Sequence, residues 1–192
     1  MNIINMIKGI LSLVYSFSLS NGEILTSFIK KNNFRNYVEV GVWKGDTLSY
    51  IANHNKILNK ISGIDPYEVK LYGNDMKGCM ALESQETFDK VYRKVIERFK
   101  GNPNIKIIKK TSKEASMDFK DNSVDLVFID ADHSYKSVKD DINLWLPKVR
   151  KGGILAGHDY YLKFFGVIQA VHEAFGIDNI GIKGIIWWTF KK

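Results

Sequence analysis

The segment Tyr37-Val-Glu-Val-Gly-Val-Trp-Lys-Gly-Asp-Thr47 joins an apolar run to a turn framed by two glycines, Gly41 and Gly45. Residues 37–40 predict a short buried strand, because a polar run precedes them and a glycine follows. The turn leads into a helix that Asp46 or Thr47 can cap. Glycines let a backbone come close to a ligand, and the free amide groups of a helix N-terminus point at that ligand. The segment therefore predicts a nucleotide-type cradle, with an ordinary strand-to-helix turn as the alternative.

The chain has 192 residues, a formal net charge of +7 and a single cysteine. This length suits one domain with a full core. The lysines are scattered and form no long basic block interleaved with aromatic residues, so we expect no nucleic-acid partner. Cys79 alone cannot build an internal disulfide framework, and it suits a reducing compartment. These features predict a cytoplasmic protein.

Residues 1–20 contain an uncharged run, rich in Leu, Val, Tyr and Phe, that follows Lys8. The run has no Ala-x-Ala-like cleavage site, and it is too short and too rich in serine to span a bilayer. Its apolar residues fall at helical spacing. We therefore expect residues 1–20 to form an N-terminal helix or lid, and residues 21–192 to form a single domain. A signal peptide is the alternative interpretation of the run.

Strand and helix patterns alternate along the rest of the chain. Because this alternation is typical of a parallel sheet covered by helices, we expect an α/β fold with a mostly parallel sheet. The expected strands cover residues 60–65, 105–108, 124–130 and 152–158, the expected helices cover residues 22–31, 86–99, 134–146 and 166–175, and an antiparallel hairpin is expected at residues 180–182 and 185–190.

Asp65 ends the second expected strand and follows Gly41 by about the 20 residues at which Rossmann-like folds place a ribose-binding carboxylate. A carboxylate in that place can accept hydrogen bonds from both ribose hydroxyls, which favours an acid over any other polar residue. The alternative is a surface aspartate that opens an Asp-Pro-Tyr turn. The polar, glycine-bearing residues 68–84 that follow predict an active-site loop.

Two clusters of acids and histidines follow the last two parallel strands, as Asp130-Ala-Asp-His133 and His158-Asp159. In open α/β sheets the ligand crevice lies outside the carboxyl ends of the strands. We therefore expect both clusters to share one edge of the sheet with the glycine cradle and Asp65.

The motifs around these clusters resemble those of a known family. Phe-Ile-Asp-Ala-Asp-His-Ser-Tyr, then Val-Lys-x-Asp, then Gly-Gly-Ile-Leu-Ala-Gly-His-Asp-Tyr are similar to class I S-adenosylmethionine-dependent methyltransferases of the methyltransferase domain 24 type. That family is related to catechol-type and macrolide-sugar O-methyltransferases. The pattern Glu39-x-Gly41 resembles the first motif of the same class, and the likeness covers about residues 22–190. It implies a Rossmann-like sheet, mostly parallel with an antiparallel C-terminal hairpin and helices on both faces.

The resemblance also implies roles for single residues. In metal-dependent relatives, an Asp after the fourth strand and an acidic or amide pair after the fifth bind a divalent ion, and a Lys or His three residues after the first Asp is the base. Carried over, Asp130, His158 and Asp159 become metal ligands and His133 becomes the base. Ser112 would face the adenine, or it would instead cap the helix that begins near Lys113. The residues implied to contact S-adenosylmethionine are Glu39, Gly41, Gly45, Asp65, Ser112 and Asp130.

His158 departs from the relatives, which usually carry Glu, Asp or Asn at this place. Imidazole suits manganese, iron or zinc better than magnesium. Two interpretations stay open: a divalent metal softer than the magnesium of the relatives, or a substrate-binding His158 with no metal.

We therefore predict an S-adenosylmethionine-dependent O-methyltransferase that acts on a small hydroxylated acceptor, such as a sugar or a natural product, and that is compatible with a homo-oligomer. A nicotinamide-dependent oxidoreductase is disfavoured because Gly-x-Gly-x-x-Gly is absent. The alternative from another class is a non-catalytic nucleotide-binding or nucleic-acid-binding Rossmann-like protein. Base methylation is disfavoured because no Asn/Asp-Pro-Pro-Tyr/Phe motif ends the fourth strand; Asp65-Pro66-Tyr67 ends the second.

Overall fold

The structure is a computed structural model that describes residues 19–71 and 84–192. The predicted helix or lid over residues 1–20 and the predicted loop over residues 68–84 therefore lie largely outside the described residues, as does Cys79. Among the described residues, no helix combines the length and the apolar character needed to cross a membrane.

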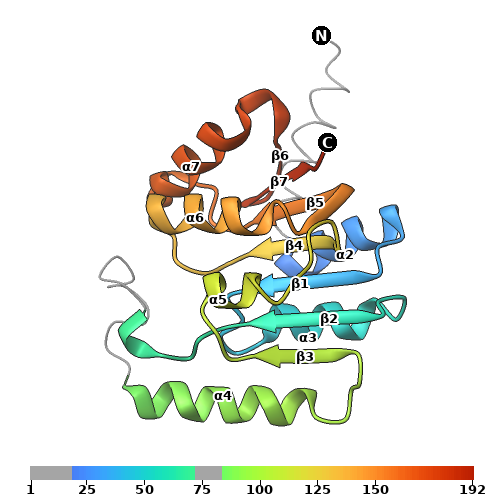
Figure 1. Ribbon diagram of the computed structural model, residues 1–192, viewed down its shortest axis with the longest axis vertical. Helices are drawn as coiled ribbons and strands as arrows, with labels where there is room; N and C mark the ends of the chain where they lie inside the picture. Colours follow the sequence, from blue (N-terminus) through green and yellow to red (C-terminus); the bar gives the residue numbers. More distant parts are fainter. Residues whose placement is uncertain (1–18, 72–83) are drawn as a thin grey trace.

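One seven-stranded sheet organises the molecule, in the order β3-β2-β1-β4-β5-β7-β6 (Figure 1). The first five strands are parallel, β7 is antiparallel to β5, and β6 is antiparallel to β7. This arrangement confirms the predicted α/β fold with its antiparallel C-terminal hairpin. The strand bounds are β1 (Asn36–Val40), β2 (Lys60–Ile64), β3 (Ile105–Ile108), β4 (Val124–Ile129), β5 (Val149–Gly157), β6 (Gly181–Lys183) and β7 (Ile186–Phe190).

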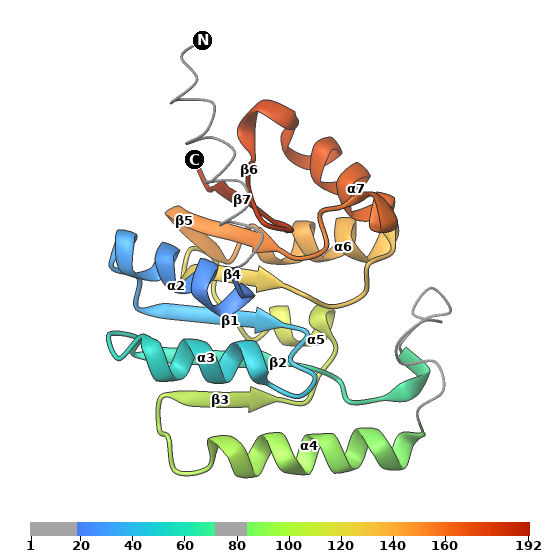
Figure 2. The ribbon, with the colours of Figure 1, turned by 180° about the vertical axis from the view of Figure 1, so that it is seen from behind.

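Helices cover both faces of this sheet, as predicted. Figures 1 and 2, which view the sheet from opposite sides, show α2 and α3 against one face and α5, α6 and α7 against the other. Side chains of α4 join the same buried cluster as those of α2 and α3. The helix bounds are α2 (Asn21–Asn32), α3 (Asp46–His54), α4 (Gln85–Phe99), α5 (Ser112–Ser116), α6 (Tyr135–Trp145) and α7 (Phe165–Phe175), with short 3-10 turns at Val69–Leu71, Leu162–Phe164 and Ile177–Asn179.

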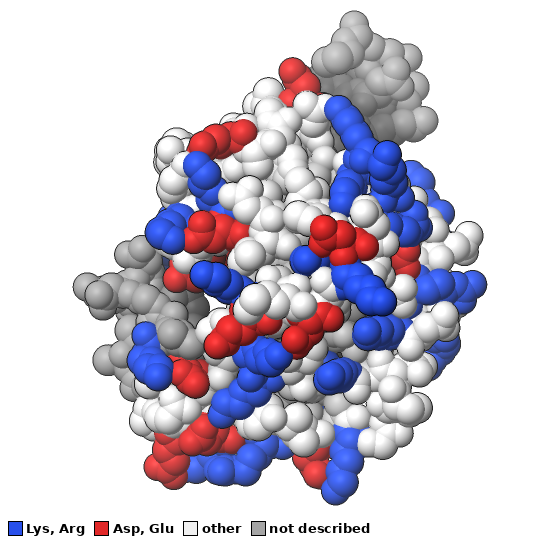
Figure 3. All heavy atoms as spheres, viewed as in Figure 1, with Lys and Arg blue, Asp and Glu red and all other residues white. Residues whose placement is uncertain are grey.

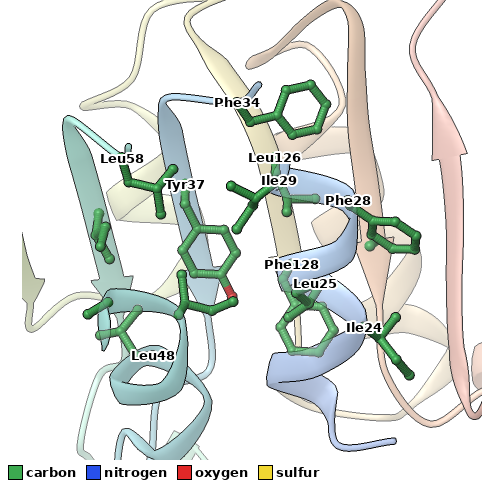
Figure 4. Close-up of a cluster of buried hydrophobic side chains, with 14 of the residues drawn as sticks. Ile24, Leu25, Phe28, Ile29, Phe34, Tyr37, Leu48, Leu58, Leu126 and Phe128 are labelled. Atoms are coloured by element: carbon green, nitrogen blue, oxygen red, sulfur yellow. The ribbon is translucent and has the colours of Figure 1, made fainter. Parts of the chain in front are cut away.

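The core on the α2 side is built from side chains of α2 and of the central strands. Figure 4 shows Leu25 and Ile29 of α2 against Leu126 and Phe128 of β4, with Tyr37 of β1 beside them. All five are almost completely buried. Because burying apolar surface is the main force that favours folding, this cluster holds β1 and β4 rigidly under the site.

The helix caps correct two details of the sequence analysis. The α3 helix begins after Gly45, which is left-handed at φ 75°, and no side chain of the described residues caps it. The predicted cap by Asp46 or Thr47 is therefore wrong; Asp46 instead forms an ion pair with Arg98 of α4 at 2.8 Å. The α5 helix is capped by Thr111 and not by Ser112, because Thr111 and Glu114 form a reciprocal capping box.

Candidate active site

The parallel register brings the predicted site residues to one level of the sheet. Val40 of β1 aligns with Ile64 of β2 and with Ile129 of β4, and Ile129 aligns with Gly157 of β5. Each of these strands is followed at once by one of the residues that the sequence analysis singled out: Gly41, Asp65, Asp130 and His158.

A cavity of about 760 Å³ opens at this edge. Its size is within the usual range for a small-molecule site. The glycine cradle and Asp65 form one part of its wall, the segment after β4 and the exposed side of α6 form the other, and Thr111 and Ser112 lie between them. The structure thus brings together around one cavity Glu39, Gly41, Gly45, Asp65, Ser112, Asp130 and His133.

Gly41 allows the first motif to pass directly against the segment after β4. Its φ is 91°, a left-handed conformation, and a Cβ added there would overlap the carbonyl oxygen of Asp130. The amide N–H of Gly41 donates to the Ile64 carbonyl at 2.8 Å, and that of Asp130 donates to the Val40 carbonyl at 2.7 Å. The cradle is therefore a close-packed backbone crossing that only glycine permits.

Asp65 holds the glycine turn in place by accepting hydrogen bonds from its backbone. Its Oδ2 accepts hydrogen bonds from the backbone N–H groups of Val42 at 3.1 Å and Trp43 at 2.8 Å, and its Oδ1 accepts from Tyr67 N–H at 2.8 Å. The residue is 1% exposed, so the alternative of a surface aspartate is wrong, although it does stabilise the Asp-Pro-Tyr turn. Its predicted contact with a ribose stays a prediction.

Glu39 lies in the floor of the cavity as a buried acid. Tyr37 donates its hydroxyl to Oε2 of Glu39 at 2.8 Å. Burial, together with the charges of Asp130 and Asp65, raises the pKa of Glu39 well above its usual value, against the opposing effect of the Tyr37 hydrogen bond. Burial in this position therefore favours the neutral form of Glu39 over the charged one.

Ser112 belongs to a partly buried hydrogen-bond network with α6. Its hydroxyl donates to Oδ1 of Asp141 and accepts a hydrogen bond from the indole N–H of Trp145 at 2.8 Å. Burial raises the pKa of Asp141 to about 6, because the Ser112 hydrogen bond only partly offsets it. The sequence analysis quoted Asp141 as the last residue of the motif Val-Lys-x-Asp but gave it no role. The available signal was an acid on the same face of α6 as the apolar residues Val138 and Trp145.

Asp130, His133, His158 and Asp159 meet beside the cavity. Nε2 of His133 lies 2.7 Å from Oδ2 of Asp159 and 3.9 Å from Oδ1 of Asp130. Nδ1 of His158 lies 3.3 Å from Oδ1 of Asp130 and 3.1 Å from Oδ2 of Asp159. The two carboxylates therefore sit between two imidazoles, and the predicted convergence of both clusters is confirmed by these distances.

The charges of this cluster depend on one another. Burial alone would lower the pKa of each histidine, but the carboxylates of Asp130 and Asp159 outweigh it and raise the pKa of His133 to about 9 and that of His158 to about 10. The histidines in turn hold the pKa values of Asp130 and Asp159 below their usual range, despite the burial of both acids. Both imidazoles are therefore protonated near neutral pH while only the two carboxylates face them.

The ring of His133 is buried and paired with an acid, but its hydrogen-bond geometry is poor. Both ring nitrogens are buried, yet within the described part of the chain neither makes a hydrogen bond with good alignment, although Asp159 is close enough for an ion pair. The ring packs at 4.6 Å from the ring of Phe164. Ser134 caps α6, so the structure does not need His133 as the cap of that helix.

The donor set fits a divalent cation. One ligand atom each from Asp130, His133 and Asp159 lie within 4.8 Å of one another, and His158 approaches the same two carboxylates. Mixed oxygen and imidazole donors suit manganese, iron or zinc. The predicted ligands were Asp130, His158 and Asp159. Because His133 also approaches both acids, it is a further nitrogen atom within reach of a cation at this place.

A family model described as a methyltransferase domain matches residues 38–160. An uncharacterized protein of Acanthamoeba polyphaga mimivirus is 31% identical over 142 residues, which are 72% of this chain and 57% of the mimivirus protein. The chain thus spans less than two thirds of that relative.

The solved structures that share the fold include two O-methyltransferases. The O-methyltransferase NovP is 17% identical with a TM-score of 0.60, over 90% of this chain and 78% of that one. An O-methyltransferase from Bacillus cereus, solved in complex with SAH, is 15% identical with a TM-score of 0.58, over 91% and 83% of the two chains. At these identities the likeness is one of fold.

Proposed function

The chain belongs to the methyltransferase-domain family, and from that membership we propose that it transfers a methyl group from S-adenosylmethionine to a hydroxyl of a small molecule. The family confirms the resemblance predicted from the motifs, to class I methyltransferases that use S-adenosylmethionine. The observation that carries the choice of a hydroxyl acceptor is the cluster of Asp130, His133, His158 and Asp159 beside the cavity.

We assign the cofactor to the cavity along the strand ends. The N-terminus of α3 offers backbone N–H groups, because no described side chain caps this helix, and the helix dipole there favours a carboxylate such as that of the methionine moiety. Asp65 supports the ribose end. Several acids line the same cavity, which suits the positive sulfonium of the donor.

The acceptor would approach from the side of the histidines. Its hydroxyl oxygen attacks the methyl carbon in line with the breaking sulfur–carbon bond, so the products are the methyl ether and S-adenosylhomocysteine, and the hydroxyl proton passes to His133. Alignment and deprotonation are the two tasks of the protein in such a transfer. The ring of Phe164 beside His133 gives this side an apolar wall.

Asp130, His158 and Asp159 would hold the divalent cation, which when bound lowers the pKa of a coordinated hydroxyl. The same residues explain how His133 becomes a base. Its pKa of about 9 depends on the negative charges of Asp130 and Asp159. If a bound cation neutralised those charges, the burial of His133 would lower its pKa. The imidazole would then be neutral near pH 7 and could accept a proton.

A methyl-transfer assay tests this function. The full chain would be incubated with S-adenosylmethionine, Mn²⁺ and a panel of sugars, catechols and other hydroxylated molecules, and S-adenosylhomocysteine would be quantified by mass spectrometry. We expect methylated product with at least one acceptor class. A parallel reaction in which a chelator replaces Mn²⁺ should give no product. Binding of S-adenosylhomocysteine without turnover on any acceptor would favour the non-catalytic alternative, and absence of binding would contradict the cofactor assignment.

A further inference from the structure

A second, smaller cavity lies at the opposite end of the strands from the candidate active site. Asn36, Lys60 and Val124 line it, and they are the first residues of β1, β2 and β4. The arrows of these strands in Figure 1 point away from this end. The volume of the cavity is about 140 Å³. Because a water molecule takes about 30 Å³ in the liquid, the cavity has room for a ligand of about four or five non-hydrogen atoms.

Ser62 gives this cavity a buried polar group without a partner. The residue is 1% exposed and lines the cavity, and its hydroxyl oxygen has no hydrogen-bond partner among the residues that the structure describes. Leaving a buried hydroxyl unpaired is costly, because burial removes the water that would otherwise bind it. A bound molecule that accepts a hydrogen bond from Ser62 would remove that cost.

Lys60 adds a positive charge to the same wall. Lys60 and Ser62 are two residues apart on β2, so their side chains leave the same face of the sheet. The acids on either side of the lining residues 123–124, Asp121 and Asp125, form their ion pairs with other basic side chains. Lys60 therefore has no acidic partner in the part of the chain that the structure describes, and its ammonium group favours an anion.

The rest of the wall is mainly apolar. Val38 and Val124 are almost completely buried, and Phe119 packs against Trp145 with the ring centres 5.2 Å apart. Nζ of Lys60 lies 5.6 Å from the centre of the Phe119 ring. The ammonium group, the free hydroxyl and the apolar side chains thus surround one small space, which suits a ligand with a short alkyl part and a negatively charged acceptor group.

We propose that this cavity is a second binding site, which takes a short-chain carboxylate such as acetate. The carboxylate accepts a hydrogen bond from the hydroxyl of Ser62 and pairs with the charge of Lys60, while its alkyl part lies against Val38 and Phe119. Both oxygens of a carboxylate are acceptors, and hydrogen bonds to a charged group are the stronger ones. The inference is independent of methyl transfer, because the two cavities lie at opposite ends of the strands.

Titration of the full-length wild type with ¹³C-labelled acetate, followed by NMR at constant ionic strength, tests this site. We expect saturable binding with a Kd of roughly 0.1–10 mM, as suits so small a ligand. Nuclear Overhauser effects should join the acetate methyl group to the ring of Phe119. Saturating S-adenosylhomocysteine should leave the Kd of acetate unchanged.

Two wild-type outcomes would overturn the proposal. A response that does not saturate would show that the cavity holds water only. Displacement of acetate by S-adenosylhomocysteine would place the acetate in the larger cavity.

Two substitutions identify the residues responsible. Lys60→Met removes the charge and Ser62→Ala removes the hydroxyl, so each should weaken acetate binding roughly 10-fold. Lys151→Met is the matched control, since Lys151 is exposed and does not line the cavity, and it should keep the wild-type Kd. Unchanged affinity in both folded variants would overturn the site. If a variant does not fold, the contact of acetate with Phe119 in the wild type decides the matter.

Discussion

The two acids and two histidines beside the cavity shift one another's pKa, so the charge of each depends on its neighbours. Asp159 is in contact with both His133 and His158, and its backbone has the left-handed φ of 57°. Such a conformation is unusual for a residue other than glycine and is tolerated where the surrounding structure over-determines it.

Replacing His133 separates its chemical role from its structural one. We expect His133→Ala to lower turnover by roughly 10²- to 10⁴-fold, because a positioned base is lost, while the affinity for S-adenosylhomocysteine hardly changes. Turnover and melting temperature would be measured on the same sample.

The matched control is His54→Ala, since His54 is exposed, stacks on Tyr50 and lies outside the cavity. It should leave turnover unchanged. A His133→Ala protein that is less stable but fully active would show that His133 serves only to pair with Asp130 and Asp159.

The raised pKa of Asp141 makes the stability of the protein depend on pH. Its folded-state pKa of about 6 lies above the usual 3.8, because of burial. Between these values the folded state binds more protons than the unfolded state, so the contribution of this group to stability falls as the pH rises from about 4 to about 6. We expect the free energy of unfolding of Asp141→Asn, relative to that of the wild type, to rise by about 2 kcal/mol between pH 4 and pH 8. Cofactor-free denaturant unfolding at both pH values measures it, and an unchanged difference would contradict the buried charge.

At the scale of elements, the site depends on two chain segments that cross at their backbones. The turn between β1 and α3 lies against the start of the segment after β4, where Gly41 faces the Asp130 carbonyl. Asp65 ties the same turn to the end of β2. The glycine turn is therefore part of the packing between elements as well as a cradle for a ligand.

A pair of glycine substitutions separates backbone strain from this close approach. Gly101→Ala should cost about 1–2 kcal/mol, because Gly101 is left-handed but a Cβ there would have no described atom within 4 Å. Gly41→Ala should cost about 2–5 kcal/mol, since it adds a clash with the Asp130 carbonyl to a similar strain. Denaturant unfolding of both variants measures the difference. Equal losses of stability in the two variants would mean that the backbone around Gly41 can shift to make room for the added Cβ.

At the scale of the whole molecule, the site divides into two parts on one edge of the sheet. Residues of β1, β2, α5 and α6 line the cavity, whereas His158 and Asp159 follow β5 and do not line it. Around these parts the surface carries mixed charge: on the face in Figure 3, lysine and arginine side chains lie among acidic ones. The expected absence of a nucleic-acid partner stays a prediction.

This division predicts that binding and chemistry can be lost separately. At 100 times its Kd, S-adenosylhomocysteine should stabilise the protein by about 2.7 kcal/mol. In a chain of this size we expect a rise of roughly 5–10 °C in melting temperature. Asp159→Ala should keep that rise while losing turnover and metal dependence, because one of few metal ligands is removed. Loss of the thermal shift in Asp159→Ala would show that the two parts are coupled.

Local pattern was enough to predict the sheet, its helices and its C-terminal hairpin. Periodicity is a property of the chain itself, so the strands at residues 60–64, 105–108 and 124–129 could be located without tertiary information. The motifs also predicted which edge carries the site, since parallel strands present their carboxyl ends together. Residues 1–18 and 72–83 lie outside the described structure, and the expectations for them stay predictions.

Tertiary packing alone decided how these residues are used. The sequence predicted that His133, His158 and Asp159 converge with Asp130, but their shared protonation follows from distances and burial that no spacing encodes. Asp65 looked like either a ribose ligand or a surface turn, and its burial under the glycine turn excludes the surface position. Asp141 stood in a motif without an assigned role, and only the approach of α5 to α6 paired it with Ser112. A side chain's charge and availability depend on what other segments place beside it, and that is a property of the fold.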